Sequence, residues 1–256
     1  MPRTPRKLSE SGIYHVMLRG IDRIQLFYDD DDHRAFLERL AHNKDRYGYS
    51  LLAYALMGNH VHLLIQEGRS GISSEIKSIA TSYAHWHNNR YERSGYLFQG
   101  RFKSEAITGD AHLLAALRYI LNNPVKIGLP INYWTSYNDY MSSANKENTL
   151  TDTTFVLKMF SERPDEAKRL LAEFLTDAVD EKLAFIEDEQ KVRHKDADAI
   201  EIIKELAQVR YCGEVASMDR NDRDLALAMC KERRLSVRQL SRLTGVNRNI
   251  VQRASL

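Results

Sequence analysis

The chain has 256 residues, of which 43% are hydrophobic and 28% are charged, a composition typical of a globular protein. Its 37 basic and 35 acidic residues give a formal net charge of +2, which excludes a uniformly basic nucleic-acid binder. The two cysteines, Cys212 and Cys230, do not form a CxxC pattern, which excludes a disulfide scaffold and disfavours a cysteine-based zinc site. No apolar run approaches the ~18 residues of a spanning helix and no secretory signal is present, so we expect a cytoplasmic protein without a membrane partner.

The charge is distributed unevenly along the chain. Residues 1–140 carry a net charge of +3, residues 141–220 carry −6, and residues 221–256 carry +5. A polar run over 142–148 is typical of a linker. We therefore expect a first domain over 1–140, an acidic helical region of unknown role over 141–220, and a small basic module over 221–256.

The first domain is predicted to alternate strands and helices. Apolar residues that recur every second position indicate strands, and spacings of three and four indicate amphipathic helices. The resulting order, β-α-β-β-α-β-α, is a ferredoxin-like α+β arrangement followed by one added helix. In chain order the predicted elements are a strand over 12–19, a helix capped within 29–32, strands over 49–57 and 61–65 separated by Gly58-Asn59, a helix over 72–86, a strand over 96–107, and a helix from Asp110 that Pro124 and Gly128 terminate.

A His-Val-His triplet begins the third predicted strand. On a strand, residues i and i+2 point to the same face, so His60 and His62 project side by side while Val61 points into the core. Two neutral imidazoles at this spacing can share one divalent metal ion, although a pair of hydrogen-bonded strand histidines is an equal alternative. His85 and His87 repeat the pattern on a helix, where a separation of ~200° prevents chelation.

A tyrosine and an asparagine occupy one face of the last predicted helix of this domain. Tyr119 lies beside or opposite the apolar stripe, and Asn123 follows four residues later. Pro124 disfavours helical geometry at Asn123, so we expect the helix to end there. The alternative is an exposed tyrosine followed by a C-capping asparagine.

Together these motifs resemble the single-tyrosine HUH transposases, and most closely the REP-associated tyrosine transposases. The resemblance covers residues 12–140, about half of the chain, and the motifs follow the order of that family. The chain departs from the common pattern at Asp22, where the family often has asparagine. The stretches that carry it are His60-Val61-His62 after Met-Gly-Asn, Tyr119 to Val125 with the sequence YILNNPV, Leu18-Arg19-Gly20 followed by Leu26-Phe27, the run from Leu97 to Lys103, and Trp134-Thr135-Ser136-Tyr137.

The resemblance implies an enzyme that cleaves and rejoins single-stranded DNA containing hairpins. It makes Tyr119 the nucleophile that forms a 5′-phosphotyrosine, and it makes His60, His62 and Asn123 the ligands of a divalent metal ion. Mixed nitrogen and oxygen ligands admit Mg²⁺ or Mn²⁺. A single tyrosine implies that strand exchange needs either a second subunit, hence a homodimer, or a second round at the same site.

Basic residues near these motifs are candidates for DNA contacts. Arg101 and Lys103 are predicted to share one face of the strand over 96–107, opposite Phe98, and they can follow a phosphate backbone. Arg19, at the end of the first strand, is a further candidate. Ordinary solvated charge is the alternative interpretation.

The basic C-terminal module resembles a helix-turn-helix. Ser236 is expected to cap its first helix, Gly245 to make the turn, and residues 247–253 to form the recognition helix. Arg248, Asn249 and Arg253 would then contact duplex DNA. The alternative is a small helical hairpin that packs on the acidic region.

These observations predict a metal-dependent, single-tyrosine DNA endonuclease or transposase. A rolling-circle replication initiator shares the same chemistry, but the chain lacks a helicase domain. A non-catalytic DNA-binding regulator that retains the HUH domain as a scaffold is the alternative from another class of protein.

Overall fold

The computed structural model separates the chain into two compact units, Met1–Ile186 and Glu187–Leu256. Each unit is described by itself. Among the described helices, none combines the length and the apolar character needed to cross a membrane. The structure describes residues 7–142, 149–176, 196–233 and 235–255, so most of the predicted linker at 142–148 lies outside the described residues.

A four-stranded antiparallel sheet forms the centre of the first unit. The strands lie in the order β2-β3-β1-β4, which together with the two crossover helices is the predicted ferredoxin-like arrangement. β1 therefore lies between β3 and β4, although those strands come much later in the chain. The strands are β1 (Ile13–Arg19), β2 (Ser50–Met57), β3 (His60–Gln66) and β4 (Lys103–Ala106).

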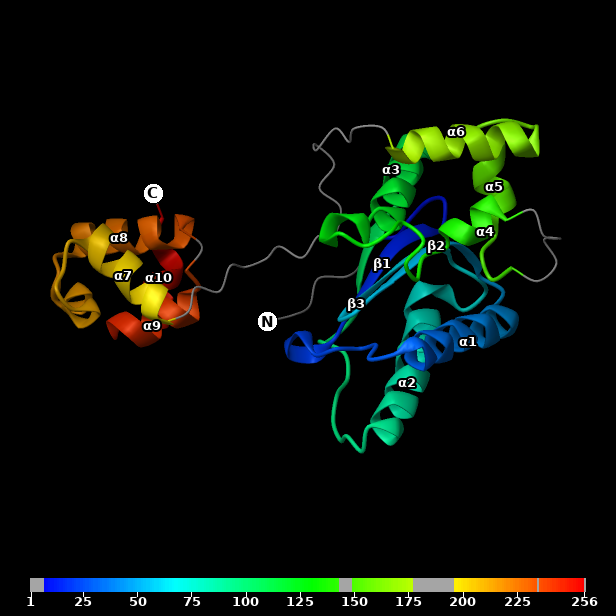
Figure 1. Cartoon of the computed structure of the whole chain (residues 1–256). Helices are drawn as coiled ribbons and strands as arrows, with labels where there is room; N and C mark the ends of the chain where they lie inside the picture. The colour runs from blue at the N-terminus through cyan, green and yellow to red at the C-terminus, as the bar shows by residue number, and fades with distance from the viewer. Residues whose placement is uncertain (1–6, 143–148, 177–195, 234, 256) are drawn as a thin grey trace. The chain divides into compact units, whose positions relative to one another are not determined.

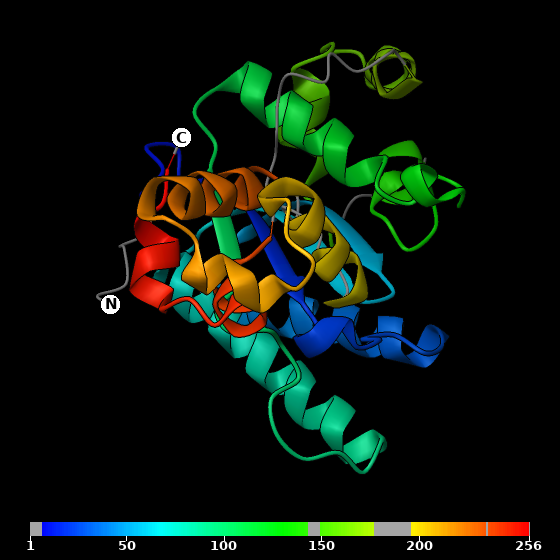
Figure 2. The same ribbon diagram turned by 90° about the vertical axis from the view of Figure 1, so that its left-hand side faces the viewer.

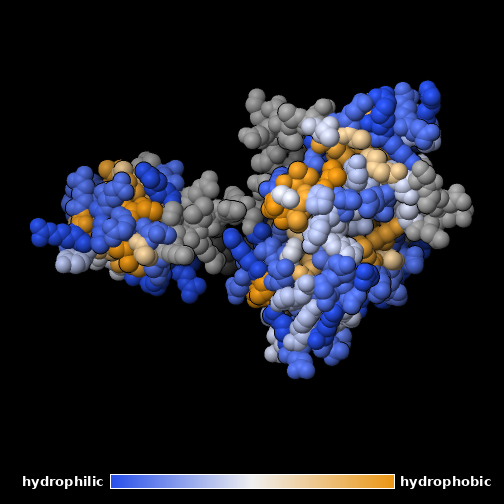
Figure 3. Space-filling view, in the orientation of Figure 1, coloured by the Kyte–Doolittle hydropathy of each residue, from blue (hydrophilic) through white to orange (hydrophobic). Residues whose placement is uncertain are grey.

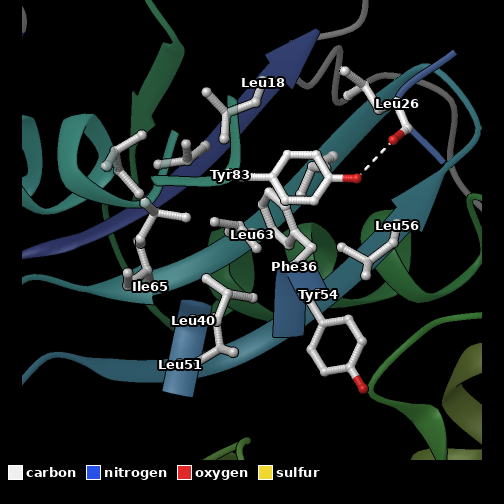
Figure 4. Close-up of a cluster of buried hydrophobic side chains, with 14 of the residues drawn as sticks. Leu18, Leu26, Phe36, Leu40, Leu51, Tyr54, Leu56, Leu63, Ile65 and Tyr83 are labelled. Atoms are coloured by element: carbon white, nitrogen blue, oxygen red, sulfur yellow. Dashed lines mark hydrogen bonds between the residues drawn. The ribbon is translucent and has the colours of Figure 1, made fainter. Parts of the chain in front are cut away.

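Helices α1 (Asp30–Tyr47) and α2 (Gly71–Arg90) cover one face of the sheet, as Figure 1 shows. The predicted cap of α1 is confirmed, because Asp29 and Asp32 form a capping box. Alternate strand residues and the apolar stripes of the helices meet in one core, which is shown in Figure 4. Within this core the Tyr83 hydroxyl donates a hydrogen bond of 2.7 Å to the Leu26 carbonyl oxygen, which satisfies the buried phenol.

Helix α3 (Asp110–Leu121) lies on the opposite face of the sheet, and Figure 2 shows it across the strands from α2. Its apolar residues pack on the strand side chains that point away from α1 and α2. The short helices that follow complete this layer, so the sheet is enclosed between two helical layers. They are η2 (Val125–Ile127), α4 (Tyr137–Met141), α5 (Thr153–Lys158) and α6 (Pro164–Thr176). A separate short helix, η1 (Ile21–Arg23), follows β1.

The strand expected over residues 96–107 is shorter than the sequence predicts. Only its last part forms β4, and residues 97–99 instead bond to the chain at the end of β1 and directly after it. Gln99 N–H donates to the Arg19 carbonyl at 2.8 Å, and Ile21 N–H donates to the Leu97 carbonyl at 2.8 Å. The segment therefore pairs with the region of β1 in two separate places, through the regular ladder of β4 and through an isolated bridge at Phe98. The continuous strand on which the predicted alternation of side chains depended is not formed.

The second unit consists of helices around a small apolar core of its own. The predicted Ser236 cap is confirmed, since its hydroxyl accepts a 3.2 Å hydrogen bond from Gln239 N–H. Gly245 adopts a φ of 74°, the left-handed conformation that favours glycine after a helix. The elements are α7 (Asp196–Ala207), η4 (Cys212–Ser217), α8 (Arg220–Glu232), α9 (Val237–Thr244) and α10 (Arg248–Arg253).

The boundary between the units differs from the expected division at 140 and 220. The acidic region 141–220 contributes helices to both units. Helices α5 and α6 pack in the core beside α3, whereas α7 and η4 pack with α8, α9 and α10. The apolar faces of the helices determine which of the two cores each helix joins, and the net charge of a segment does not indicate where those faces lie.

The visible surface of the chain is mostly hydrophilic, with hydrophobic patches on both units (Figure 3). Val125 and Ile127 of η2 are 50% and 65% exposed. Two exposed aliphatic residues therefore follow directly after the helix that carries Tyr119.

Candidate active site

A tight hairpin places two histidines at the start of β3. Gly58 and Asn59 connect β2 to β3, and Met57 pairs with His60 across the turn. The predicted alternation is confirmed, because Val61 packs in the core under α1 and α2. His60 and His62 point to the other face, where their ring centroids lie 5.0 Å apart with the rings nearly perpendicular.

Helix α3 places Tyr119 beside this pair. The centroid of the Tyr119 ring lies 5.6 Å from that of His62. The helix end is held by α6, because Arg118 stacks on the Phe174 ring at 3.5 Å and the Asn122 amide donates a 2.9 Å hydrogen bond to the Leu175 carbonyl. Arg118 directly precedes Tyr119, and Asn122 follows it by three positions. Part of the predicted acidic region of unknown role therefore holds the tyrosine helix in place.

Asn123 joins the histidines although it lies outside the helix. α3 ends at Leu121, two residues before Asn123, in keeping with the effect of Pro124 on the residue that precedes it. The Asn123 side chain is 7% exposed and forms a hydrogen bond with His60 that raises the pKa of the imidazole. An imidazole nitrogen and an amide oxygen within hydrogen-bonding reach of each other are a suitable donor pair for a metal ion.

The donor set fits a divalent metal ion. Burial, with a smaller contribution from Arg19, lowers the pKa of His60 to about 4, and burial places the pKa of His62 well below 6.5. Both imidazoles are therefore neutral at pH 7, the form that ligates metals. Among the described residues no three His, Cys, Asp or Glu side chains form a metal-binding group. The amide of Asn123 is the candidate oxygen donor beside the two imidazoles.

Two cations flank the tyrosine. The Lys126 ammonium lies 3.8 Å from the Tyr119 ring centroid. Arg19 on β1 lies opposite His60 on β3. Burial lowers the pKa of the Arg19 guanidinium, and the charge of Tyr119 raises it. Both side chains can therefore stabilise negative charge on the phenol oxygen and on a phosphate held beside it.

The structure brings some of the predicted DNA-contacting residues to the site and separates others from it. Arg19 lies at the site. Lys103 is exposed at the start of β4, on the strand positions that alternate with those of the α1–α2 core, and Arg101 is exposed in a bend before the strand. The expected shared strand face of Arg101 and Lys103 is therefore absent. Arg248, Asn249 and Arg253 are exposed on α10 in the second unit.

Sequence reasoning missed two residues of the site, His15 and Lys126. His15 is fully buried, and its ring centroid lies 5.2 Å from that of His62 and 5.6 Å from that of Tyr119. Alternation along β1 combined with the ferredoxin-like strand order would have placed His15 beside β3. No local pattern marks Lys126, whose position depends on how the chain turns after Pro124.

The buried histidines predict a fold that loses stability in acid. Burial lowers the pKa of His15 from 6.5 to about 3, with smaller contributions from His112 and Lys126, and burial also lowers the pKa of His33 and of His87. Below pH 6.5 the unfolded chain binds protons that the folded chain does not, so stability is complete above pH 6.5 and falls as the pH drops. His15 alone should lower the free energy of unfolding by about 2 kcal/mol between pH 7 and pH 5.

Urea unfolding followed by circular dichroism at pH 7, 6 and 5 measures this loss. A free energy of unfolding that stays constant over this range would contradict the prediction.

Part of the chain is similar to known proteins. Residues 9–123 match the family model described as "Transposase IS200 like". A solved REP-associated tyrosine transposase bound to a REP hairpin is 19% identical, covers 60% of this chain and 96% of its own, and gives a TM-score of 0.48. A solved putative transposase from Deinococcus radiodurans R1 is 18% identical, covers 48% of this chain and 97% of its own, and gives a TM-score of 0.34. No curated protein matches the chain. The match covers a little under half of the chain and includes both histidines and the tyrosine, so this part of the chain is similar to the IS200-like transposases.

Proposed function

We propose that this protein is a transposase that cleaves and rejoins single-stranded DNA through a covalent bond between Tyr119 and a 5′-phosphate. The observation that carries the proposal is the convergence of His60, His62, Tyr119 and Asn123 on one face of the sheet, from strands and a helix far apart in the chain. The hairpin form of the substrate follows from the resemblance of the motifs.

The proposed cleavage is a transesterification. The Tyr119 oxygen forms a bond to phosphorus, the bond from phosphorus to the 3′-oxygen breaks, and the phenol proton passes to solvent while the departing 3′-oxygen takes up a proton. One phosphodiester is exchanged for another, so rejoining requires no nucleotide cofactor. Lys126 and Arg19 stabilise the charge of the attacking oxygen and orient the phosphate.

His60, His62 and Asn123 would hold a divalent metal ion. When bound, Mg²⁺ or Mn²⁺ would polarise the scissile phosphate and offset the charge of the leaving oxygen. Mn²⁺ suits the two imidazoles better, and both ions accept an amide oxygen.

A covalent-capture experiment tests the proposal. The full chain is incubated with a hairpin oligonucleotide labelled at its 3′ end, or at its 5′ end in a parallel reaction, with Mn²⁺, with Mg²⁺ or with EDTA. We expect the 3′ label to shift to the size of the protein and the 5′ label to appear on a shortened free strand. Absence of an adduct across a panel of hairpin sequences would overturn the proposal, and transfer of the 5′ label would reverse the polarity of the linkage.

We further propose that the second unit binds duplex DNA through α10. The unit provides exposed Arg248 and Arg253, whose guanidinium groups form no ion pair with any residue that the structure describes. Arg242, in contrast, is engaged with Asp196 at 2.6 Å, a contact that links α9 to the start of α7. Unengaged cations on the second helix of a helix-turn-helix are suited to phosphate and base contacts.

Replacing both Arg248 and Arg253 with alanine is expected to weaken binding to duplex DNA by roughly 10- to 100-fold at low salt and to reduce the salt dependence of binding. Fluorescence anisotropy over a range of salt concentrations measures both quantities. Arg220→Ala, at a side chain that is 85% exposed on α8, is the matched control and should leave the affinity unchanged. Equal effects of the control and the double variant would indicate nonspecific electrostatics and contradict the assignment.

A further inference from the structure

His15 is a buried polar residue that the proposed chemistry does not use. It lies on β1, which pairs with β3 in a register that places Met17 opposite His62 and His15 opposite Leu64. His15 is therefore diagonal to His62 on the same face of the sheet. Its Nε2 atom lies 2.9 Å from Nδ1 of His62, which is hydrogen-bonding distance.

His60 has an equivalent contact on the same ring atom. Its Nδ1 lies 2.8 Å from the amide oxygen of Asn59, which can only accept a hydrogen bond. The hydrogen of the neutral His60 ring is therefore placed on Nδ1 when Asn59 is engaged. The nitrogen that remains for a metal ion is Nε2.

We propose that His15 is a positioning residue that keeps the hydrogen of His62 on Nδ1 and so presents the Nε2 lone pair at the metal site, as Asn59 does for His60. The inference rests on the proposed function, because it assigns a purpose to the orientation of a proposed ligand. In the contact between two neutral imidazoles either ring can donate, but only donation by His62 leaves its Nε2 free of hydrogen. Partners behind a ligating histidine fix its tautomer and ring orientation in this way.

The burial of the pair strengthens the argument. His62 is 2% exposed and His15 is fully buried, so bulk water does not compete for Nδ1. Replacement of His15 by a side chain without an acceptor would leave a buried ring nitrogen without a partner, and the ring would turn or change tautomer to recover one.

The tautomer can be measured without any metal. Nitrogen-15 NMR of the histidine rings in the metal-free full chain should show His62 protonated at Nδ1. His15→Phe should abolish that state, whereas His15→Gln should retain it in part, because an amide oxygen can accept from Nδ1. A wild-type protein with the His62 hydrogen on Nε2 would overturn the inference.

Metal affinity provides the second measurement. Mn²⁺ binding is measured by electron paramagnetic resonance in a Tyr119→Phe background, with and without a hairpin oligonucleotide, so that no cleavage contributes. We expect His15→Phe to weaken Mn²⁺ binding 10- to 100-fold, with partial recovery in His15→Gln. His87→Phe is the matched control, since His87 is also fully buried but contacts Tyr28, Tyr83 and Tyr91 in the α1–α2 layer.

The outcomes separate the two proposals. If the parent binds Mn²⁺ and His15→Phe binds it equally well, the role of His15 is overturned while the metal site stands. If the parent binds no Mn²⁺ under either condition, the metal site of the proposed function is overturned, and the role of His15 with it. Circular dichroism and thermal unfolding establish that each variant is folded, and His15→Gln keeps the test decisive if His15→Phe fails to fold.

Discussion

Replacement of Tyr119 by phenylalanine is expected to abolish the covalent protein–DNA adduct while leaving the fold intact. The substitution removes only the hydroxyl oxygen, and the ring keeps its packing against the core beside α3 and beneath Lys126. Loss of the attacking atom should reduce adduct formation by at least ~10³-fold. The same hairpin should still bind, because binding depends on charges that the variant keeps.

The adduct is quantified by denaturing electrophoresis of the 3′-labelled hairpin, and binding is quantified by anisotropy. Tyr47→Phe provides the matched control, because Tyr47 packs against the core at the end of α1 and is not among the site residues. If Tyr119→Phe forms an adduct at the wild-type rate, another residue is the nucleophile and the proposed mechanism is wrong.

The second large effect is expected at the metal ligands. His60→Ala should lower adduct formation by roughly 10³-fold, as should treatment of the wild-type protein with EDTA. The two losses differ in reversibility, because added Mn²⁺ should restore the EDTA-treated wild type but not the variant. His60 is a better choice than His62, since His60 is only half-buried, whereas His62 is 2% exposed and lies within hydrogen-bonding distance of the fully buried His15.

His85 supplies the control, since it belongs to the second His-x-His sequence but is exposed on α2. His85→Ala should retain both activity and Mn²⁺ binding. Full activity of His60→Ala in the presence of EDTA would show that cleavage needs neither the imidazole nor the metal.

Much of the fold can be predicted from the sequence wherever local patterns determine the structure. The alternation around Val61, the capping residues Asp29 and Ser236, and the Gly58-Asn59 turn all correspond to observed elements. In each case the stabilising contact lies within a few residues, so the chain's local chemistry is sufficient to specify it.

The parts that were missed depend on contacts between distant segments. The shortened β4 results from bonding of residues 97–99 to the chain after β1, about eighty residues earlier in the sequence. Phe174 and Leu175, which contact the end of α3, belong to the acidic region 141–220, whose composition does not predict these contacts. His15 likewise becomes part of the site only when β1 pairs with β3.

The position of β1 in the centre of the sheet has a consequence during synthesis of the protein. β1 is the first strand to be made, yet both of its neighbours, β3 and β4, are made later, and Tyr119 later still. A ribosome-bound chain that has emerged as far as β3 possesses both candidate ligand histidines but neither the proposed nucleophile nor the helix that carries it. In the proposed function, the residues needed for cleavage are therefore complete only once Asn123 has been synthesised, so a chain that stops before α3 would be unable to form the adduct.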